Sequence, residues 1–155
     1  MELDIKDRTF LRYLRRNARE NLTTISRKTH IPISTLYDRL KAGESAFMLR
    51  HTTLVDFTKL GYHCRVSVTV KVPRDQRDQI GRFLSTNENV NTVYKINNGF
   101  DYLFEGIFRH VKDHEDFMEH MESKFKIVSK QIHYIIEDVV REHFLAGDQP
   151  IDMMG

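Results

Sequence analysis

The chain has 155 residues, of which 40% are hydrophobic and 30% charged, a composition typical of a soluble globular protein with one ordinary domain or two small ones. No apolar run approaches the roughly 20 residues that a membrane-spanning helix needs. The charged N-terminus has no apolar signal segment, and a single cysteine, Cys64, cannot form an internal disulfide. We therefore expect a cytoplasmic protein without membrane association.

The net charge of +2 is unevenly distributed. Residues 1–50 carry eleven Lys and Arg against six Asp and Glu, a net charge of +5. Residues 51–155 carry thirteen against sixteen, a net charge of −3. The basic first third is suited to a polyanionic partner, and the mildly acidic remainder to a different task.

The basic part has the periodicity of three short helices. Asp4 and Asp7 resemble an N-cap and an acidic first turn, and Asn21 is placed to cap a second helix. Residues 30–44 predict a third helix, which Gly43 is placed to end. Because only a few residues join the last two helices, the pattern is that of a helix-turn-helix. The residues expected to face inward are Phe10, Leu11, Leu14, Ala18, Leu22, Ile25, Leu36 and Leu40.

Beyond the third helix the pattern changes to strands and helices in the order β-α-β-β-α-β, a ferredoxin-like arrangement. Apolar residues alternate from Cys64 to Val72, as they do in a half-buried strand, and residues 126–144 predict a long last strand or a strand that runs into a short helix. The expected fold class is α+β. The expected domains are a helix-turn-helix domain at 1–45, a linker strand region at 46–62, a ferredoxin-like effector and dimerisation domain at 63–146 and a flexible tail at 147–155.

The third helix carries side chains suited to double-stranded DNA. A helix in the major groove needs an apolar face that packs on its own domain, and short polar side chains near its N-terminus that reach base edges. Basic side chains further along reach bases or phosphates, and a basic pair on the preceding helix would lie near the backbone. The alternative is an ordinary solvated helix with a salt-bridged arginine. The predicted DNA contacts are Arg27, Lys28, Ser34, Thr35, Tyr37, Arg39 and Lys41.

Three segments carry a resemblance to a known family: LDIKDRTFLRYLRRNAR, IPISTLYDRLK and GFDYLFEGIF. In this order they resemble the first helix, the recognition helix and the effector-domain segment of the Lrp/AsnC (feast/famine) transcription regulators. The resemblance covers roughly residues 3–145. It implies a DNA-binding regulator that forms a homodimer or higher homo-oligomer through its C-terminal domain and responds to an amino-acid-like effector. No cofactor and no catalytic residue are expected.

The chain departs from the family at the effector segment. Where the family has Gly-Asp before Phe-Asp-Tyr-Leu, this chain has Asn98-Gly99, which also fits a tight hairpin turn. The resemblance places effector recognition here, with Asp101 facing an ammonium and the N–H groups of Asn98 and Gly99 facing a carboxylate. Because an acidic group is missing, we expect a weak, altered or absent amino-acid response. His30 also replaces the usual glycine before the recognition helix, which we expect to change the local geometry.

Two other functions remain open. An enzyme similar to the sirohaem decarboxylases would need a basic pocket lined by His and Arg in the sheet domain, whereas that half of the chain is net acidic. A low-specificity architectural DNA-binding protein would share the basic N-terminal part. His110 and His114 have a spacing compatible with a divalent metal, but they lie at a charged junction where solvated histidines are usual, so no metal site is predicted.

Overall fold

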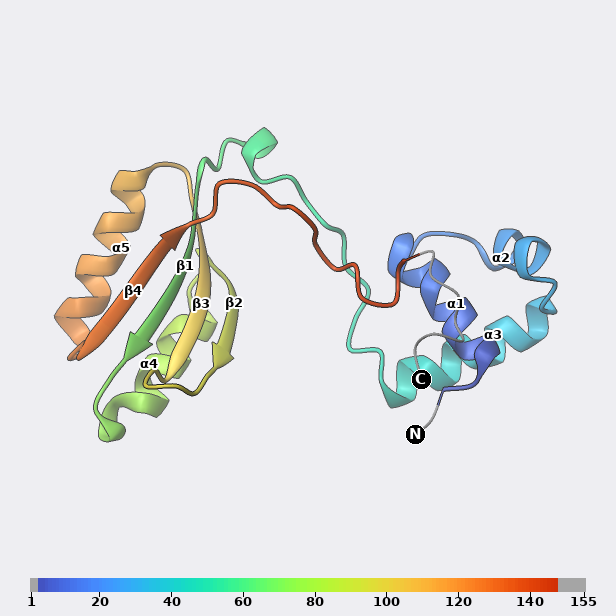
Figure 1. Cartoon of the computed structure of the whole chain (residues 1–155), viewed down its shortest axis with the longest axis horizontal. Coiled ribbons are helices and arrows are strands. Elements are labelled where there is room, and N and C mark those ends of the chain that lie inside the picture. Colours follow the sequence, from blue (N-terminus) through green and yellow to red (C-terminus); the bar gives the residue numbers. More distant parts are fainter. Residues whose placement is uncertain (1–2, 148–155) are drawn as a thin grey trace. The chain divides into compact units, whose positions relative to one another are not determined.

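The computed structural model describes residues 3–147, which form two compact units (Figure 1). In the described part, the first unit contains residues 3–54 together with residues 139–147, and the second runs from Val55 to Asp138. The chain therefore passes between the units twice. No helix in the described part combines the length and apolar character needed to cross a membrane.

Three helices build the first unit, and their caps agree with prediction. Asp4 accepts a hydrogen bond from the N–H of Asp7 (2.7 Å), and the Asp7 carboxylate accepts one from the N–H of Asp4 (3.2 Å), which completes a capping box. Asn21 caps the second helix through the N–H of Thr24 (2.8 Å). The helices are α1 (Ile5–Arg16), α2 (Leu22–Thr29) and α3 (Ile33–Ala46). The buried core between them consists of Phe10, Ile25, Ile31 and Leu36.

Two details of these helices differ from prediction. α3 continues through Gly43 to Ala46 instead of ending at the glycine. Gly43 is buried, and a Cβ there would lie 2.7 Å from the terminal methyl of Met48, so the glycine provides room for the chain that leaves the helix. α1 ends at Arg16, so Ala18 lies exposed beyond it rather than on its buried face.

Residues 139–147, here called the C-terminal segment, are held against α1 by arginine side chains. Arg15 donates from Nε to the carbonyl of Phe144 (3.2 Å), and from Nη2 to the carbonyl (3.0 Å) and carboxylate (2.9 Å) of Glu142. The segment itself forms neither a strand nor a helix. The segment is thus part of the first unit, whereas the expected boundary of the ferredoxin-like domain was at residue 146.

The last strand is shorter than expected. It ends at Tyr134, and the prediction that residues 126–144 form one long strand or end in a helix is wrong. Further along, Arg16 donates from Nε to the carbonyl of Ala146 (2.6 Å). The expected tail at 147–155 lies, from residue 148 onward, outside the described residues.

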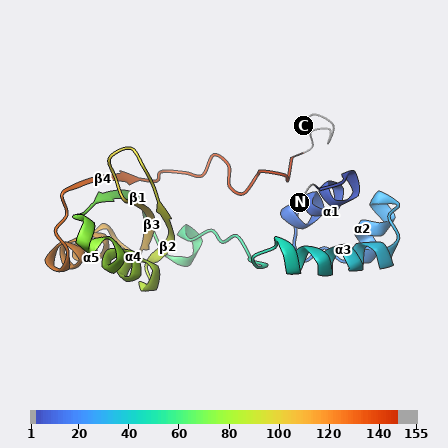
Figure 2. The same ribbon diagram turned by 90° about the horizontal axis from the view of Figure 1, so that it is seen from below.

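The second unit is a four-stranded antiparallel sheet in the order β2-β3-β1-β4, with both long helices on the same face (Figure 2). β1 is central, and its Val68 pairs with Phe104 on one side and Ile132 on the other. This is the ferredoxin-like topology, so the α+β prediction is confirmed. The elements are β1 (Cys64–Lys71), α4 (Arg77–Thr86), β2 (Val90–Lys95), β3 (Tyr102–Phe108), α5 (Val111–Lys124) and β4 (Ser129–Tyr134).

The core of this unit lies between the sheet and the two helices. The predicted alternation is confirmed, because every second residue from Cys64 to Val72 is buried. From the helix side, α4 contributes Ile80 and Leu84, and α5 contributes Phe117 with the methionines that follow it. The ring of Phe117 packs on those of Phe83, Phe104 and Phe108, with centroids 5.4–5.9 Å apart.

His114 on α5 is fully buried, which corrects the expectation of a solvated histidine. Its ring lies edge-on to Phe108 (5.5 Å between centroids) and Tyr134 (5.7 Å), and burial lowers its pKa from the ordinary 6.5. A neutral imidazole therefore fills a gap in the core. Within residues 3–147, no three His, Cys, Asp or Glu side chains gather to hold a metal ion.

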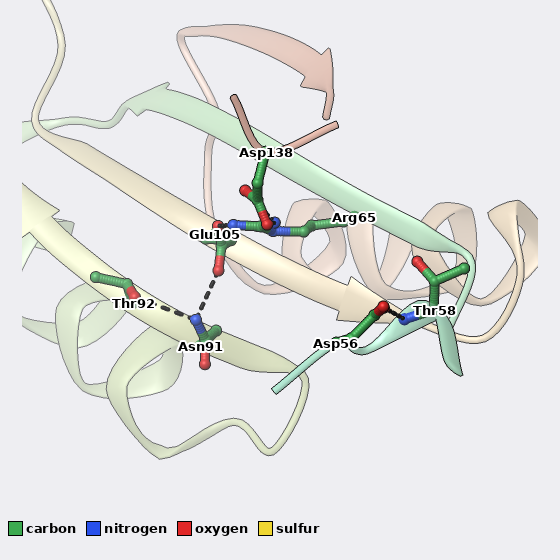
Figure 3. A network of polar contacts seen from close by, with 7 residues as sticks. All are labelled: Asp56, Thr58, Arg65, Asn91, Thr92, Glu105 and Asp138. Atoms are coloured by element: carbon green, nitrogen blue, oxygen red, sulfur yellow. Dashed lines mark hydrogen bonds and ion pairs between the residues drawn. The ribbon is translucent and has the colours of Figure 1, made fainter. Parts of the chain in front are cut away.

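The sheet face opposite the helices carries a polar network centred on Arg65 (Figure 3). Arg65 Nη1 donates to both oxygens of Asp138 (2.7 and 2.8 Å), and its Nη2 donates to Glu105 (2.7 Å). Asn91 of β2 donates to the other oxygen of Glu105 (2.6 Å). The network thus joins three strands and fixes the point at which the chain leaves this unit after β4.

The connector between α3 and β1 contains no strand, which corrects the expected strand region at 46–62. Residues 48–56 are irregular, and Thr58–Leu60 form a short 3-10 turn, η1. Asp56 initiates this turn by accepting a hydrogen bond from the N–H of Thr58 (3.1 Å).

Candidate nucleic-acid interface

The turn between α2 and α3 is short and tightly specified. His30 ends α2 in the left-handed conformation, with φ 58° and ψ 20°. This is the backbone geometry that glycine adopts most readily, so the histidine keeps the turn that a glycine would make. Ile31 then enters the core, and Pro32 precedes the first turn of α3. The helix-turn-helix pattern is thus kept with His30 at this position, as expected.

α3 buries one face and exposes the other. Leu36 and Gly43 are buried, while Thr35 is half-buried. Lys41 lies with its Nζ 5.7 Å from the centroid of the Tyr37 ring. The exposed residues of the first two turns and the start of the third are Ile33, Ser34, Tyr37, Asp38 and Lys41.

Arg39 is placed differently from the other predicted DNA contacts. Its guanidinium donates to both oxygens of Asp4 (2.9 and 2.8 Å) and to the carboxylate of Asp7, and its side chain is only 22% exposed. We call this arrangement the Arg39 clasp. It joins α3 to the N-terminal cap of α1, so Arg39 orients the recognition helix rather than pointing away from the protein. Sequence periodicity could not predict a pairing across 32 residues.

The clasp shifts the ionisation of its members. The hydrogen bond from Arg39, assisted by the N–H of Asp7, lowers the pKa of Asp4 from 3.8 to about 2. The same contacts raise the pKa of Arg39 above its ordinary value. Asp4 and Arg39 are therefore both charged at neutral pH.

The basic pair at the end of α2 is exposed on the surface of the first unit. Arg27 is exposed, and Lys28 lies with its Nζ 3.8 Å from a carboxylate oxygen of Glu20 and 5.6 Å from the centroid of the Tyr13 ring. Contacts of this kind at the surface are weak, and leave Lys28 available to a phosphate group.

The hairpin between β2 and β3 contains the predicted effector residues. Asn98 and Gly99 both have positive φ, 60° and 88°, as a two-residue turn of this type requires. Asp101 points into the protein: one oxygen accepts from the N–H of Val72 (2.9 Å) and the other pairs with Arg77 Nε (2.7 Å). With its side chain only 11% exposed, Asp101 anchors the base of the hairpin.

No protein-family model matches the chain. Its sequence is similar to HTH-type transcriptional regulators of Pyrococcus, described as uncharacterized. It is 26% identical to one from Pyrococcus furiosus and 24% to one from Pyrococcus horikoshii. Each alignment spans 145 residues, covering 93% of this chain and 97% of the relative.

The fold is similar to those of several solved regulators. LrpC of Bacillus subtilis matches with a TM-score of 0.81 at 20% identity, over 90% of this chain and 99% of that one. AsnC of Escherichia coli matches with 0.79 at 14% identity, over 91% and 97%. The transcriptional regulator NMB0573 of Neisseria meningitidis, solved as a complex with L-Met, matches with 0.83 at 17% identity, over 90% and 94%.

The chain thus has the fold of the Lrp/AsnC transcription regulators, and its sequence relatives are HTH-type transcriptional regulators. The resemblance found in its three motifs is confirmed. The relatives are named as regulators and not as enzymes, in agreement with the prediction that the chain is not an enzyme.

Replacing Arg39 by Met keeps the aliphatic stem but leaves two carboxylates facing each other without a cation. We expect Arg39→Met to lower the melting temperature of the helical unit by several degrees at neutral pH, measured by circular dichroism. Lys41→Met removes a cation from the exposed face of the same helix, where ion pairs are weak, and should change the melting temperature little.

The difference between wild type and Arg39→Met should also depend on pH. Because the folded pKa of Asp4 lies below its unfolded value, the contribution of the clasp is present above about pH 4 and is lost as the pH falls towards 2. The two melting temperatures should therefore converge over this range. Equal melting temperatures at neutral pH would show that the clasp does not hold the unit together.

Proposed function

We propose that the chain is a sequence-specific, DNA-binding transcription regulator. The observation that carries this proposal is the exposed face of α3, which presents Ser34, Tyr37 and Lys41 outward while the Arg39 clasp fixes its opposite side. Hydroxyls and cations at the start of a recognition helix are the groups that contact bases and phosphates in the major groove. Thr35 lies at the border of this face. The net charge of +5 over residues 1–50 supports attraction to DNA.

The residues of the proposed interface have different roles. Arg27, Lys28 and Lys41 contact phosphates, while Ser34, Thr35 and Tyr37 contact base edges. Arg39 has its guanidinium bonded within the protein, so its role is to orient α3. This assignment refines the sequence-based set, in which Arg39 was a direct contact.

The active form is proposed to be a dimer or higher oligomer. One helix-turn-helix buries too little surface for tight binding, and dimers of such modules engage two half-sites about one helical turn apart. Large apolar side chains exposed outside the helical core support self-association. They are Leu49, Leu54, Tyr94, Tyr134, Ile136 and Val139.

The proposal includes an amino-acid effector site. The solved NMB0573 regulator is a complex with L-Met. The family resemblance implies that an effector of this chain would bind at the turn formed by Asn98 and Gly99. However, Asp101 is paired with Arg77 and Val72, so it is poorly placed to meet an ammonium group. We therefore propose a weak, altered or absent response to amino acids.

The DNA proposal is tested by salt dependence. The logarithm of affinity should fall with the logarithm of salt concentration, with a slope near −0.9 for each phosphate neutralised. Arg27→Ala and Lys28→Ala should weaken binding to all duplexes alike and flatten this slope. Thr35→Ala should instead lose roughly 1–3 kcal/mol of discrimination at one base pair.

Lys112→Ala provides the matched control, because Lys112 is an exposed cation of the second unit that pairs with Asp116 one turn along α5. It should leave both affinity and slope unchanged. Unchanged binding in all the α2 and α3 variants would remove these helices from the interface. Equal affinity for selected and random duplexes would instead favour the architectural alternative.

The effector proposal predicts little thermal stabilisation by amino acids. Free ligand at 100 times its Kd adds roughly 2.7 kcal/mol of stability, which a thermal-shift screen of the standard amino acids at millimolar concentration detects. Gly99→Asp restores the missing acid, and nothing lies within 4 Å of a new Cβ, but the φ of 88° strains any side chain at this position. The shift of each variant is therefore measured against its own ligand-free melting temperature. We expect Gly99→Asp to gain a shift, and Gly99→Asn, its uncharged control, to gain none. A wild-type shift as large as that of Gly99→Asp would contradict the proposal.

A further inference from the structure

The first two turns of α3 expose an apolar pair, Ile33 and Tyr37, of which only Tyr37 is among the predicted DNA contacts. Ile33 is 47% exposed and Tyr37 is 52% exposed. At a spacing of four residues they lie on the same face of the helix, one turn apart. Neither belongs to the apolar cluster that holds the three helices together. Single exposed apolar residues are common on proteins, but this pair occupies the part of α3 that enters the groove in the proposed function.

The polar side chains around this pair indicate what it contacts. Ser34 lies beside Ile33, and the Lys41 ammonium lies over the Tyr37 ring, 5.7 Å from its centroid. A matching partner must therefore offer small apolar groups next to hydrogen-bond acceptors and negative charge. In the major groove, thymine offers its C5-methyl group beside the O4 acceptor, close to the phosphates, and no other base of ordinary DNA carries a methyl group.

We propose that Ile33 and Tyr37 determine sequence specificity by packing against the C5-methyl groups of thymines in each half-site. This inference rests on the proposed function, and adds the base that α3 selects and the two side chains that select it. Ile33 recognises a methyl group with its branched aliphatic chain, and Tyr37 does so with its ring. The adjacent hydroxyl of Ser34 donates to a neighbouring acceptor.

Ile33 can be altered without disturbing the fold. It is the first residue of α3, its side chain is half exposed, and alanine has the higher helix propensity. Ile5 provides a matched control because it is the first residue of α1 and is 64% exposed. An effect of Ile33→Ala that Ile5→Ala does not share therefore arises from the place of Ile33 on α3.

The experiment removes single methyl groups from the DNA. The full-length chain first selects a preferred duplex from random DNA, and each thymine of that duplex is then replaced singly by deoxyuridine, which lacks only the C5-methyl. Wild type and Ile5→Ala should lose about three- to tenfold in affinity at each of two thymines per half-site. Ile33→Ala should bind the thymine and uracil forms of one of these positions equally. At the other thymine position, Tyr37→Ala should bind the thymine and uracil forms equally, while Tyr37→Phe should still prefer thymine.

The outcomes separate this inference from the proposed function. A selected duplex whose affinity for wild type is unchanged by every uracil overturns the inference and leaves the regulator proposal standing. Thymine preference that persists in both Ile33→Ala and Tyr37→Ala overturns it as well. If the wild-type chain selects no duplex over random DNA, the proposed function itself fails.

Discussion

The geometry of the proposed interface depends on the Arg39 clasp, a contact on the side of α3 opposite to its exposed face. Asp4 both caps α1 and accepts two hydrogen bonds from Arg39, so the start of the first helix and the middle of the third are fixed to each other. The core beneath them is small, with four buried apolar residues. A core of this size stabilises the helices but leaves the rotation of one helix relative to another weakly constrained. The bidentate contact between the Arg39 guanidinium and the Asp4 carboxylate specifies that rotation. The outward direction of Tyr37 and its neighbours follows from it.

The first unit is also built from two distant parts of the chain. In the first unit, Arg15 binds the C-terminal segment through main-chain carbonyls. In the second unit, Arg65 of β1 binds Asp138, the last residue of that unit. The second crossing, from Asp138 to Val139, is thus flanked by one arginine contact in each unit. Carbonyl and carboxylate acceptors suit this purpose because they hold an irregular segment without requiring a strand or helix.

Periodicity and caps predicted the helices, the order of helices and strands along the chain and the alternating burial of β1, because these features depend on local spacing. The failures depend on contacts that spacing does not encode. Gly43 resembles a helix stop, but it lies inside the helix, where the side chains of Met48 and Phe47 pack close to its Cα. His114 lies among charged neighbours in sequence, but one side of α5 packs on the sheet and takes the histidine into the core. Arg39 was predicted as a contact to bases or phosphates, with a salt-bridged arginine as the alternative. The structure shows the salt bridge, and nothing in the sequence identifies Asp4 as its partner.

The central claim is that α3 distinguishes DNA sequences in an orientation set by the clasp. The most direct test is the ratio of affinities for a selected duplex and its scrambled form, measured for wild type and for Arg39→Met at a temperature where both are folded. We expect a wild-type ratio of about 10³ or more. We expect Arg39→Met to lower this ratio strongly, while its affinity for the scrambled duplex stays nearly the same as that of wild type. An unchanged ratio in Arg39→Met, or a wild-type ratio near one, would contradict the central claim.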